Sequence, residues 1–395
     1  MTLTITNITN SIQSYDDFDG HEMVIMAEDK DIRFKAFLSV HNTSRGPALG
    51  GCRYWSRYNN DAEAIMDVLR LSRGMTYKNA LADLPLGGGK AVIVGLPGTR
   101  TPTPDMMRAL GKAVESMQGK YITAEDVGMS VDMMLVARGV TPHVSGLPIK
   151  VIAPDYIPDA VSKADMPDAD PSPYTAFGVF QAIRASAKAR MGKDDLSGVL
   201  VSVKGYGNVA RTLCALLKDA GAIVTVSEID QGRMDLAESE GFTVLDKNRD
   251  IMAHPADIYA PCALGGDIRD ETIPVLVKAG VKIVAGAANN QLAKAHHAER
   301  MKEKGILYAP DYVANAGGVI SVGIQQVWSE SPAKETFPTH TKIHHRIGQI
   351  YDVMTEIFKR ADETGANTAH IANVIAEERF KGAGACVSRK VSRAA

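Results

Sequence analysis

A short glycine-containing segment, Gly205-Tyr-Gly-Asn-Val-Ala210, constrains the fold of this chain more than any other feature. It follows an apolar run at 198–203, which is typical of a buried parallel strand, and it opens a helical pattern that stops at Gly221. A second β-branched run, 223–226, then leads to Glu228. The order strand, Gly-x-Gly-x-x-Ala, helix, strand, acid predicts a dinucleotide-binding unit in a doubly wound α/β fold.

The residues of this segment have distinct expected roles. Gly205 permits the tight turn, Gly207 lets the backbone approach a pyrophosphate, and Ala210 permits close packing of helix on strand. The start of the helix, with Asn208 and Val209, offers free N–H groups and the positive end of the helix dipole to the phosphates. We therefore expect these five residues to contact the cofactor.

Glu228 is placed to accept hydrogen bonds from an adenosine ribose. Its carboxylate would repel a 2′-phosphate, which favours NAD over NADP, although Arg233 lies close enough in sequence to soften that preference. Two alternatives stay open. A methyltransferase-type nucleotide site also uses a glycine turn and an acid on the second strand, and a glycine turn in a doubly wound sheet can bind nothing.

The composition indicates a globular, soluble chain. Its 395 residues predict two or three domains, and 45% hydrophobic with 23% charged residues excludes disordered and fibrous classes. A formal net charge of −2 gives no indication of a nucleic-acid partner, and no apolar run approaches the roughly 20 residues of a membrane span. The four cysteines form no Cys-x-x-Cys pair, so we expect a reducing cytoplasm and no bound metal.

Two glycine-rich stretches precede residue 130. Gly50 and Gly51 leave backbone N–H groups open to a small ligand, although a plain turn explains them equally well. Leu86-Gly-Gly-Gly-Lys90 is not a phosphate-binding loop, because Leu84 and Ala91 stand where that loop needs a glycine and a hydroxyl residue. These glycines instead indicate backbone held against a ligand beside Lys90.

Lys78 and Lys90 are candidates for a shared site. Lys78 lies near the end of a predicted helix and Lys90 at the start of a predicted strand. If they converge, one ammonium can fix a substrate carboxylate, while the other, near a like charge and partly desolvated, can act as a base. The alternative is a pair of solvated surface lysines.

Asp126 follows the predicted strand 121–124, in Tyr121-Ile-Thr-Ala-Glu-Asp-Val-Gly128. Carboxylates at the end of a strand are common at active-site edges of α/β proteins, which makes Asp126 a candidate proton carrier. The alternative for Glu125 or Asp126 is capping of the helix that starts near Ser130.

Several motifs in order resemble the Glu/Leu/Phe/Val dehydrogenase family, and most closely its leucine dehydrogenase branch. They are Met75–Lys78, Gly87–Lys90, Thr123–Gly128, Pro171–Gly178, Lys204–Ala210, Ala260–Gly266, Gly286–Leu292 and Tyr308–Val319. The resemblance covers most of the chain. It implies NAD-dependent oxidative deamination of an L-amino acid to a 2-oxo acid and ammonium.

The same resemblance implies roles for individual residues. Lys78 would bind the substrate carboxylate, Lys90 would activate water against the imino acid, and Asp126 would carry protons to and from the amino nitrogen. Substrate contacts are also implied for Gly50, Gly51, Met75 and Asn290, and cofactor contacts for Thr175, Ala260, Cys262, Ala287 and Asn290.

The implied side-chain pocket is apolar, since it is lined by Leu49, Ala124, Val319 and Val322. A second carboxylate on the substrate would lack a partner there and be costly to bury. Branched-chain amino acids such as leucine and valine therefore fit best. An aromatic substrate, as in a phenylalanine- or tryptophan-type dehydrogenase, stays an alternative, as does a non-catalytic NAD-binding regulator.

The resemblance also predicts two domains. Residues 1–165, completed by helices within 330–395, would form the substrate-binding, catalytic and oligomerisation domain, and residues 166–329 the Rossmann NAD-binding domain. We expect a homo-oligomer, a dimer or larger. The stretch 141–171, rich in Pro, Asp and Ala, is longer than in leucine enzymes and is either a surface insertion without a role or an influence on substrate access.

Overall fold

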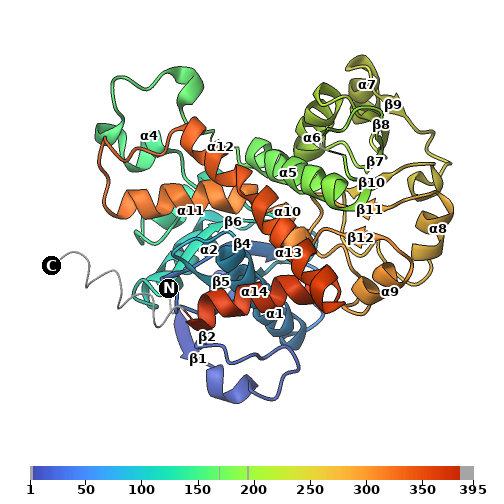
Figure 1. The fold of residues 1–395 in the computed structure, drawn as a ribbon. Coiled ribbons are helices and arrows are strands. Elements are labelled where there is room, and N and C mark those ends of the chain that lie inside the picture. The colour runs from blue at the N-terminus through green and yellow to red at the C-terminus, as the bar shows by residue number, and fades with distance from the viewer. Residues whose placement is uncertain (1–2, 169, 194, 383–395) are drawn as a thin grey trace. The chain divides into compact units, whose positions relative to one another are not determined.

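The computed structural model describes residues 3–168, 170–193 and 195–382, and the chain divides into two compact units (Figure 1). Neither unit is continuous in sequence. Unit 1 comprises residues 1–161, 322–338 and 376–395, and unit 2 comprises residues 162–321 and 339–375. The helices α11 (Gly317–Glu330) and α14 (Thr368–Lys381) therefore each contribute residues to both units.

Unit 1 is built on a mixed six-stranded sheet in the order β1-β2-β3-β5-β4-β6. The first three strands and β5 pair antiparallel, whereas β4 pairs parallel to both β5 and β6. The strands are β1 (Thr4–Asn7), β2 (Met23–Asp29), β3 (Phe34–Asn42), β4 (Ala48–Trp55), β5 (Gly87–Val94) and β6 (Tyr121–Glu125).

Helices cover both faces of this sheet. The 21-residue helix α1 (Asp61–Leu81) begins at Asn60, whose side chain accepts a hydrogen bond from the Glu63 N–H, and it packs one apolar face on β3 and β5. Helices α2 (Pro104–Glu115) and α3 (Val131–Arg138) share a separate apolar cluster with the other face. Each large side chain buried in these clusters stabilises the unit by about 1.5–3 kcal/mol.

The alternation along β5 decides where Lys90 points. Ala91 and Ile93 belong to the α2 and α3 cluster, whereas Val92 belongs to the α1 cluster. Because successive strand residues face opposite sides, Lys90 lies on the α1 side with Val92.

Unit 2 contains a second six-stranded sheet, entirely parallel, in the order β12-β11-β10-β7-β8-β9. The chain order reverses beside β7, as in a doubly wound fold, which confirms the predicted fold class. The strands are β7 (Leu200–Lys204), β8 (Ile223–Ser227), β9 (Thr243–Val244), β10 (Ile258–Pro261), β11 (Ile283–Val284) and β12 (Leu307–Tyr308). The connecting helices include α6 (Asn208–Asp219), α7 (Gln231–Ser239), α8 (Ile273–Lys278), α9 (His297–Glu303) and α10 (Asp311–Ala314).

The partner of two C-terminal helices differs from the prediction. Helices α12 (His340–Gly348) and α13 (Ile350–Thr364) belong to unit 2 and pack on α5 (Ser172–Met191), so the prediction that all of 330–395 completes the first domain is wrong for 339–375. At Gly178 of α5, an added Cβ would lie 2.9 Å from Ile350 Cδ1. An amphipathic pattern identifies the apolar face of a helix and leaves its partner open.

The first part of the 141–171 stretch is integrated into unit 1. Val144 forms a parallel bridge with Thr123, and both Val144 and Leu147 are buried in the cluster of α2 and α3. Short helical turns follow at α4 (Ile149–Ile152), η2 (Pro154–Tyr156) and η3 (Lys163–Asp165). Among the helices of the described residues, none combines the length and apolarity that a membrane crossing requires.

Two glycines test the packing of α1 on β5. An added Cβ at Gly88 would lie 2.0 Å from the Thr76 backbone nitrogen, whereas a Cβ at Gly74, on the exposed side of α1, meets nothing within 4 Å. We expect Gly88→Ala to lower the free energy of unfolding by about 1–3 kcal/mol and Gly74→Ala to raise it by about 0.5–1 kcal/mol. Urea unfolding of both variants checks this, and equal stability of the two would contradict the described packing.

Candidate active site and nucleotide-binding segment

Lys90 and Asp126 form a buried ion pair in unit 1. Lys90 Nζ lies 2.7 Å from Asp126 Oδ2, and the Lys90 side chain is only 8% exposed. The two residues come from β5 and from the end of β6, which are separated in the sheet by β4. The solvated-lysine alternative is therefore wrong for Lys90.

Gly51 makes this contact across the sheet possible. It pairs with Ala124 of β6, and the next residue, Cys52, pairs with Ala91 of β5, so Gly51 lies in the row between Lys90 and Ala124. A Cβ at Gly51 would lie 2.8 Å from Asp126 Cβ and 2.7 Å from the Glu125 carbonyl oxygen. Any side chain there would displace Asp126.

Gly50 is held just as closely. A Cβ at this position would lie 1.8 Å from the Gly89 carbonyl oxygen and 3.2 Å from Met75 Cγ. The fully buried Tyr121 donates its hydroxyl hydrogen bond to the Gly50 carbonyl oxygen at 2.8 Å. The sequence reasoning did not single out Tyr121, because a tyrosine at the start of a predicted strand carries no signal of that contact.

Lys78 is half-buried in the last turn of α1. Earlier in the same part of the helix, Met75 lies beside Gly50 and Thr76 lies beside Gly88, so this end of α1 covers the glycine-bearing stretches of β4 and β5. The roles of Lys78 and Met75 toward a substrate stay predictions.

The predicted side-chain pocket residues fall in both units. Leu49 and Ala124 of unit 1 are buried, with exposed fractions of 1% and 8%. Val322 belongs to unit 1 and Val319 to unit 2, and both are half-buried. All four are apolar, as expected for a hydrophobic substrate.

Arg53 is a member of the ion-pair cluster that the sequence analysis did not single out. Arg53 Nε lies 3.5 Å from Asp126 Oδ2, and Arg53 Nη1 lies 3.1 Å from Asp67 Oδ2. Burial alone would raise the pKa of Asp126, but the charges of Lys90 and Arg53 outweigh it and hold that pKa below its usual range. The signal was present in the sequence, since Arg53 follows Gly51 by two residues and so shares its strand face.

The glycine turn of unit 2 has the geometry that its sequence predicts. Gly205 has φ +98°, a region that favours glycine, and its N–H donates to the Ser227 carbonyl oxygen at 2.7 Å. Gly207 precedes α6, and a Cβ there would meet nothing within 4 Å, which leaves open space at the helix start. Ala210 is buried against the sheet, whereas Asn208 is exposed. This arrangement fits a dinucleotide phosphate at the free N–H groups.

Glu228 holds the glycine turn. Its carboxylate accepts hydrogen bonds from the backbone N–H groups of Tyr206 at 2.7 Å, Ile229 at 2.7 Å and Asp230 at 3.1 Å. Burial would raise the pKa of Glu228, but these three donors, together with Arg233 at 3.9 Å, lower it. Since a carboxylate offers about four acceptor sites, one remains for the predicted ribose contact.

Asn290 lies in a loop that its neighbours hold tightly. It has φ +53°, and the next residue, Gln291, donates from its side chain to the Gly286 and Ala288 carbonyl oxygens. The Asn315 amide donates to Asn289 Oδ1 at 2.8 Å and to the carbonyl oxygen of Ala287. The positive φ fits an asparagine, which tolerates the left-handed region better than most residues.

The remaining predicted cofactor residues lie elsewhere in unit 2. Thr175, on α5, donates from its hydroxyl to the Pro171 carbonyl oxygen at 3.1 Å. Ala260 is buried in β10, and Cys262 follows that strand with its N–H donating to the Lys204 carbonyl oxygen at 2.9 Å. These positions leave their cofactor contacts as predictions.

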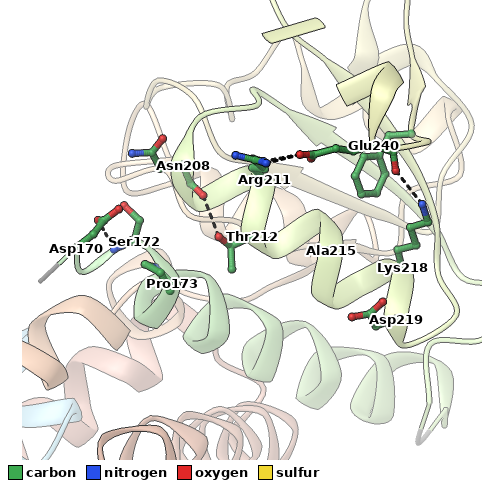
Figure 2. Close-up of a pocket in the computed structure, with 11 residues that line it drawn as sticks. Asp170, Ser172, Pro173, Asn208, Arg211, Thr212, Ala215, Lys218, Asp219 and Glu240 are labelled. Atoms are coloured by element: carbon green, nitrogen blue, oxygen red, sulfur yellow. Dashed lines mark hydrogen bonds and ion pairs between the residues drawn. The ribbon is translucent and has the colours of Figure 1, made fainter. Parts of the chain in front are cut away.

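A groove of 740 Å³ lies beside α6 (Figure 2). It runs from Ser172 and Pro173 at the start of α5 along the α6 side that carries Asn208, Arg211 and Lys218. Of the predicted cofactor residues, Asn208 alone is among those that line it. The groove therefore follows the side of α6 and does not coincide with the glycine turn.

Two adjacent histidines lie beside Asp270. His296 is exposed and His297 is buried, and Nε2 of each lies 3.6 Å from Asp270 Oδ2. His297 Nδ1 accepts a hydrogen bond from the Lys294 N–H at 3.0 Å. The ligand atoms of Asp270, His296 and His297 all lie within 4.8 Å of one another, a spacing that could hold a metal ion.

Residues in both units match models of one known protein family. Residues 21–143 match the family described as Glu/Leu/Phe/Val dehydrogenase, dimerisation domain, and residues 225–384 match Glutamate/Leucine/Phenylalanine/Valine dehydrogenase. A leucine dehydrogenase of Geobacillus stearothermophilus is 42% identical over 94% of this chain and 92% of its own. A phenylalanine dehydrogenase of Bacillus thermotolerans is 36% identical over 96% and 93%. The crystal structure of L-tryptophan dehydrogenase from Nostoc punctiforme has a TM-score of 0.74 at 36% identity, over 92% of this chain and 97% of that one.

The structure predicts that Glu228→Gln weakens dinucleotide binding. The amide keeps the size of the side chain, but it has one oxygen where three N–H donors converge, and it carries no charge. Loss of a charged hydrogen bond of about 1.5–3 kcal/mol predicts a rise of roughly tenfold or more in the Kd for NADH, measured by fluorescence titration. Glu238→Gln, at an exposed position of α7, is the matched control. An unchanged Kd in Glu228→Gln would contradict the assignment.

Proposed function

The chain belongs to the Glu/Leu/Phe/Val dehydrogenase family, and we propose that it catalyses the reversible, NAD-dependent oxidative deamination of a hydrophobic L-amino acid to the 2-oxo acid and ammonium. The observation that carries this proposal is the buried contact between Lys90 and Asp126. A protein that only binds NAD has no use for a desolvated lysine held against a carboxylate, which disfavours a non-catalytic regulator.

The paired groups are suited to moving protons. Bound NAD supplies the hydride acceptor for the Cα hydrogen. Lys90 acts as the base that activates water against the imino acid, and Asp126 carries protons to and from the amino nitrogen. With Nζ and Oδ2 at 2.7 Å, the charge of each group directly favours the charged form of the other.

Substrate recognition divides between one charge and an apolar pocket. Lys78 binds the substrate carboxylate from the last turn of α1. The pocket residues Leu49, Ala124, Val319 and Val322, with Met75, offer no charge to a second carboxylate. Glutamate-like substrates are therefore excluded by the cost of burying an unpaired charge.

Within the hydrophobic substrates, we propose a branched-chain amino acid such as leucine or valine. Support comes from small aliphatic pocket residues and from the 42% identity to a leucine dehydrogenase, compared with 36% to a phenylalanine dehydrogenase. An aromatic amino acid is the second candidate, because the chain is also 36% identical to a tryptophan dehydrogenase of the same fold.

Three further proposals concern organisation. Unit 1 supplies the substrate and proton-transfer groups, and unit 2 supplies the NAD-binding groups. The protein acts as a homo-oligomer, for which the support is the dimerisation-domain description matched by residues 21–143. It works in the cytoplasm, in keeping with the absence of Cys-x-x-Cys pairs in the sequence.

The proposed function is tested by NADH oxidation with ammonium and a panel of 2-oxo acids. The panel contains 4-methyl-2-oxopentanoate, 3-methyl-2-oxobutanoate, phenylpyruvate, indolepyruvate and 2-oxoglutarate. We expect the fastest turnover with one of the first two. A preference for an aromatic oxo acid would favour the second candidate, and silence across the panel with NADH still bound would overturn the proposal.

Lys90→Ala tests the assignment of the base. We expect kcat to fall by about 10²–10⁴-fold, the usual contribution of a positioned acid or base, with the Kd for NADH unchanged. Steady-state kinetics and fluorescence titration provide the two readouts. Lys112→Ala, on the exposed side of α2, is the control, and near-normal turnover in Lys90→Ala would refute the role.

Lys78→Ala tests the carboxylate contact separately. Loss of one charge-assisted hydrogen bond of about 1.5–3 kcal/mol predicts a KM for the amino acid that is raised roughly tenfold or more. The KM for NAD is expected to change little. An unchanged amino acid KM would show that another group binds the carboxylate.

A further inference from the structure

We infer that Arg53 is a positioning residue for the reaction proposed above: its guanidinium bridges Asp126 and Asp67 and thereby holds the Asp126 carboxylate, ionised, against Lys90. The inference rests on the proposed function for its kinetic consequences. Its structural part stands on contacts within unit 1 alone.

The guanidinium forms a hydrogen-bonded ion pair with one carboxylate and a longer ion-pair contact, without a hydrogen bond, with another. On one side Arg53 Nε lies 3.5 Å from Asp126 Oδ2, and on the other Nη1 donates to Asp67 Oδ2 at 3.1 Å. Asp67, on α1, is itself fixed by a hydrogen bond from the Tyr58 hydroxyl. The side chains of Arg53, Asp67 and Asp126 are each only 23–24% exposed, so these contacts are shielded from solvent.

The cluster alternates in sign, with Lys90, Asp126, Arg53 and Asp67 in succession. Both cations approach the same oxygen, Asp126 Oδ2, which is itself buried. Lys90 has to gain and lose a proton in the proposed reaction, so its attraction for Asp126 changes during turnover. Arg53 stays charged throughout and keeps the carboxylate in place when Lys90 is neutral.

Arginine is the residue type that this bridge requires. Its planar fork presents several N–H donors in fixed directions, so one side chain can contact two separate carboxylates. A lysine also has three donors, but all of them sit on one nitrogen, whereas Arg53 reaches Asp126 from Nε and Asp67 from Nη1. Arg53 reaches both because it lies on the same face of β4 as Gly51, with α1 packed over that side.

The other titratable groups near Asp126 stay neutral. They are Cys52 on β4 and Tyr121 on β6, both fully buried, and burial raises the pKa of each far above neutrality. Lys90 from β5 and Arg53 from β4 are therefore the charges that decide the ionisation of Asp126.

Two variants separate the charge of Arg53 from its geometry. Arg53→Gln removes the charge that helps to lower the pKa of Asp126, so we expect that pKa to rise and kcat to fall at least tenfold. Arg53→Lys keeps the charge and loses the bridge, so we expect a smaller rise in that pKa but a similar fall in kcat. The pKa is followed by ¹³C NMR of aspartate-labelled protein, with Asp126→Asn to assign the signal. The control is Arg57→Gln, because Arg57 is exposed and stacks on Trp55.

The outcomes are distinct. Wild-type kcat in Arg53→Lys would overturn the bridge, and an unchanged Asp126 pKa in a folded Arg53→Gln protein would overturn the electrostatic part. If Arg53→Gln does not fold, the kcat of Arg53→Lys is the deciding measurement. A reduced kcat supports the positioning role, and a wild-type kcat overturns it. If the wild-type protein turns over no 2-oxo acid, the proposed function fails, while the NMR titration still tests the hold of Arg53 on Asp126.

Discussion

The buried contact between Lys90 and Asp126 is the interaction on which the rest of unit 1 depends. Removing two charges from water is costly, and a buried ion pair often stabilises a fold no better than apolar residues of the same volume. Its presence therefore points to use in chemistry. The pair requires a residue without a side chain between its members, and that residue is Gly51.

Close backbone packing around the pair follows from the same requirement. Gly50 allows close approach of Gly89 on the neighbouring strand and of Met75 on α1, and Gly88 allows close approach of Thr76. In unit 2, hydrogen bonds rather than close backbone packing fix the shape of the predicted binding segment. There a carboxylate, Glu228, collects backbone N–H groups and fixes the glycine turn, because a loop with unpaired N–H groups would not keep one shape.

Local patterns in the amino-acid sequence predicted much of this structure. The strand–turn–helix order around Gly205 predicted the doubly wound sheet. The glycines before Lys90 and the strand that ends in a carboxylate indicated Lys90 and Asp126. What the patterns could not supply was pairing between distant segments. Alternation places Arg53 on the strand face of Gly51, but the contacts of Arg53 with Asp126 and of Tyr121 with Gly50 follow only from the register of β4 with β5 and β6. In the same way, α12 and α13 show an apolar face without naming α5 as their partner, and Asp270 is 26 residues from His296 in sequence.

The central claim, that the ammonium group at position 90 is the base, is tested most directly by chemical replacement. Lys90→Cys, followed by alkylation with 2-bromoethylamine, rebuilds an ammonium group at nearly the length of lysine. Wild-type protein treated in the same way controls for reaction at the native cysteines. We predict that Lys90→Cys binds NADH without turnover and that alkylation restores deamination. Turnover by the unmodified variant, or a folded and alkylated variant that stays inactive, would contradict the account.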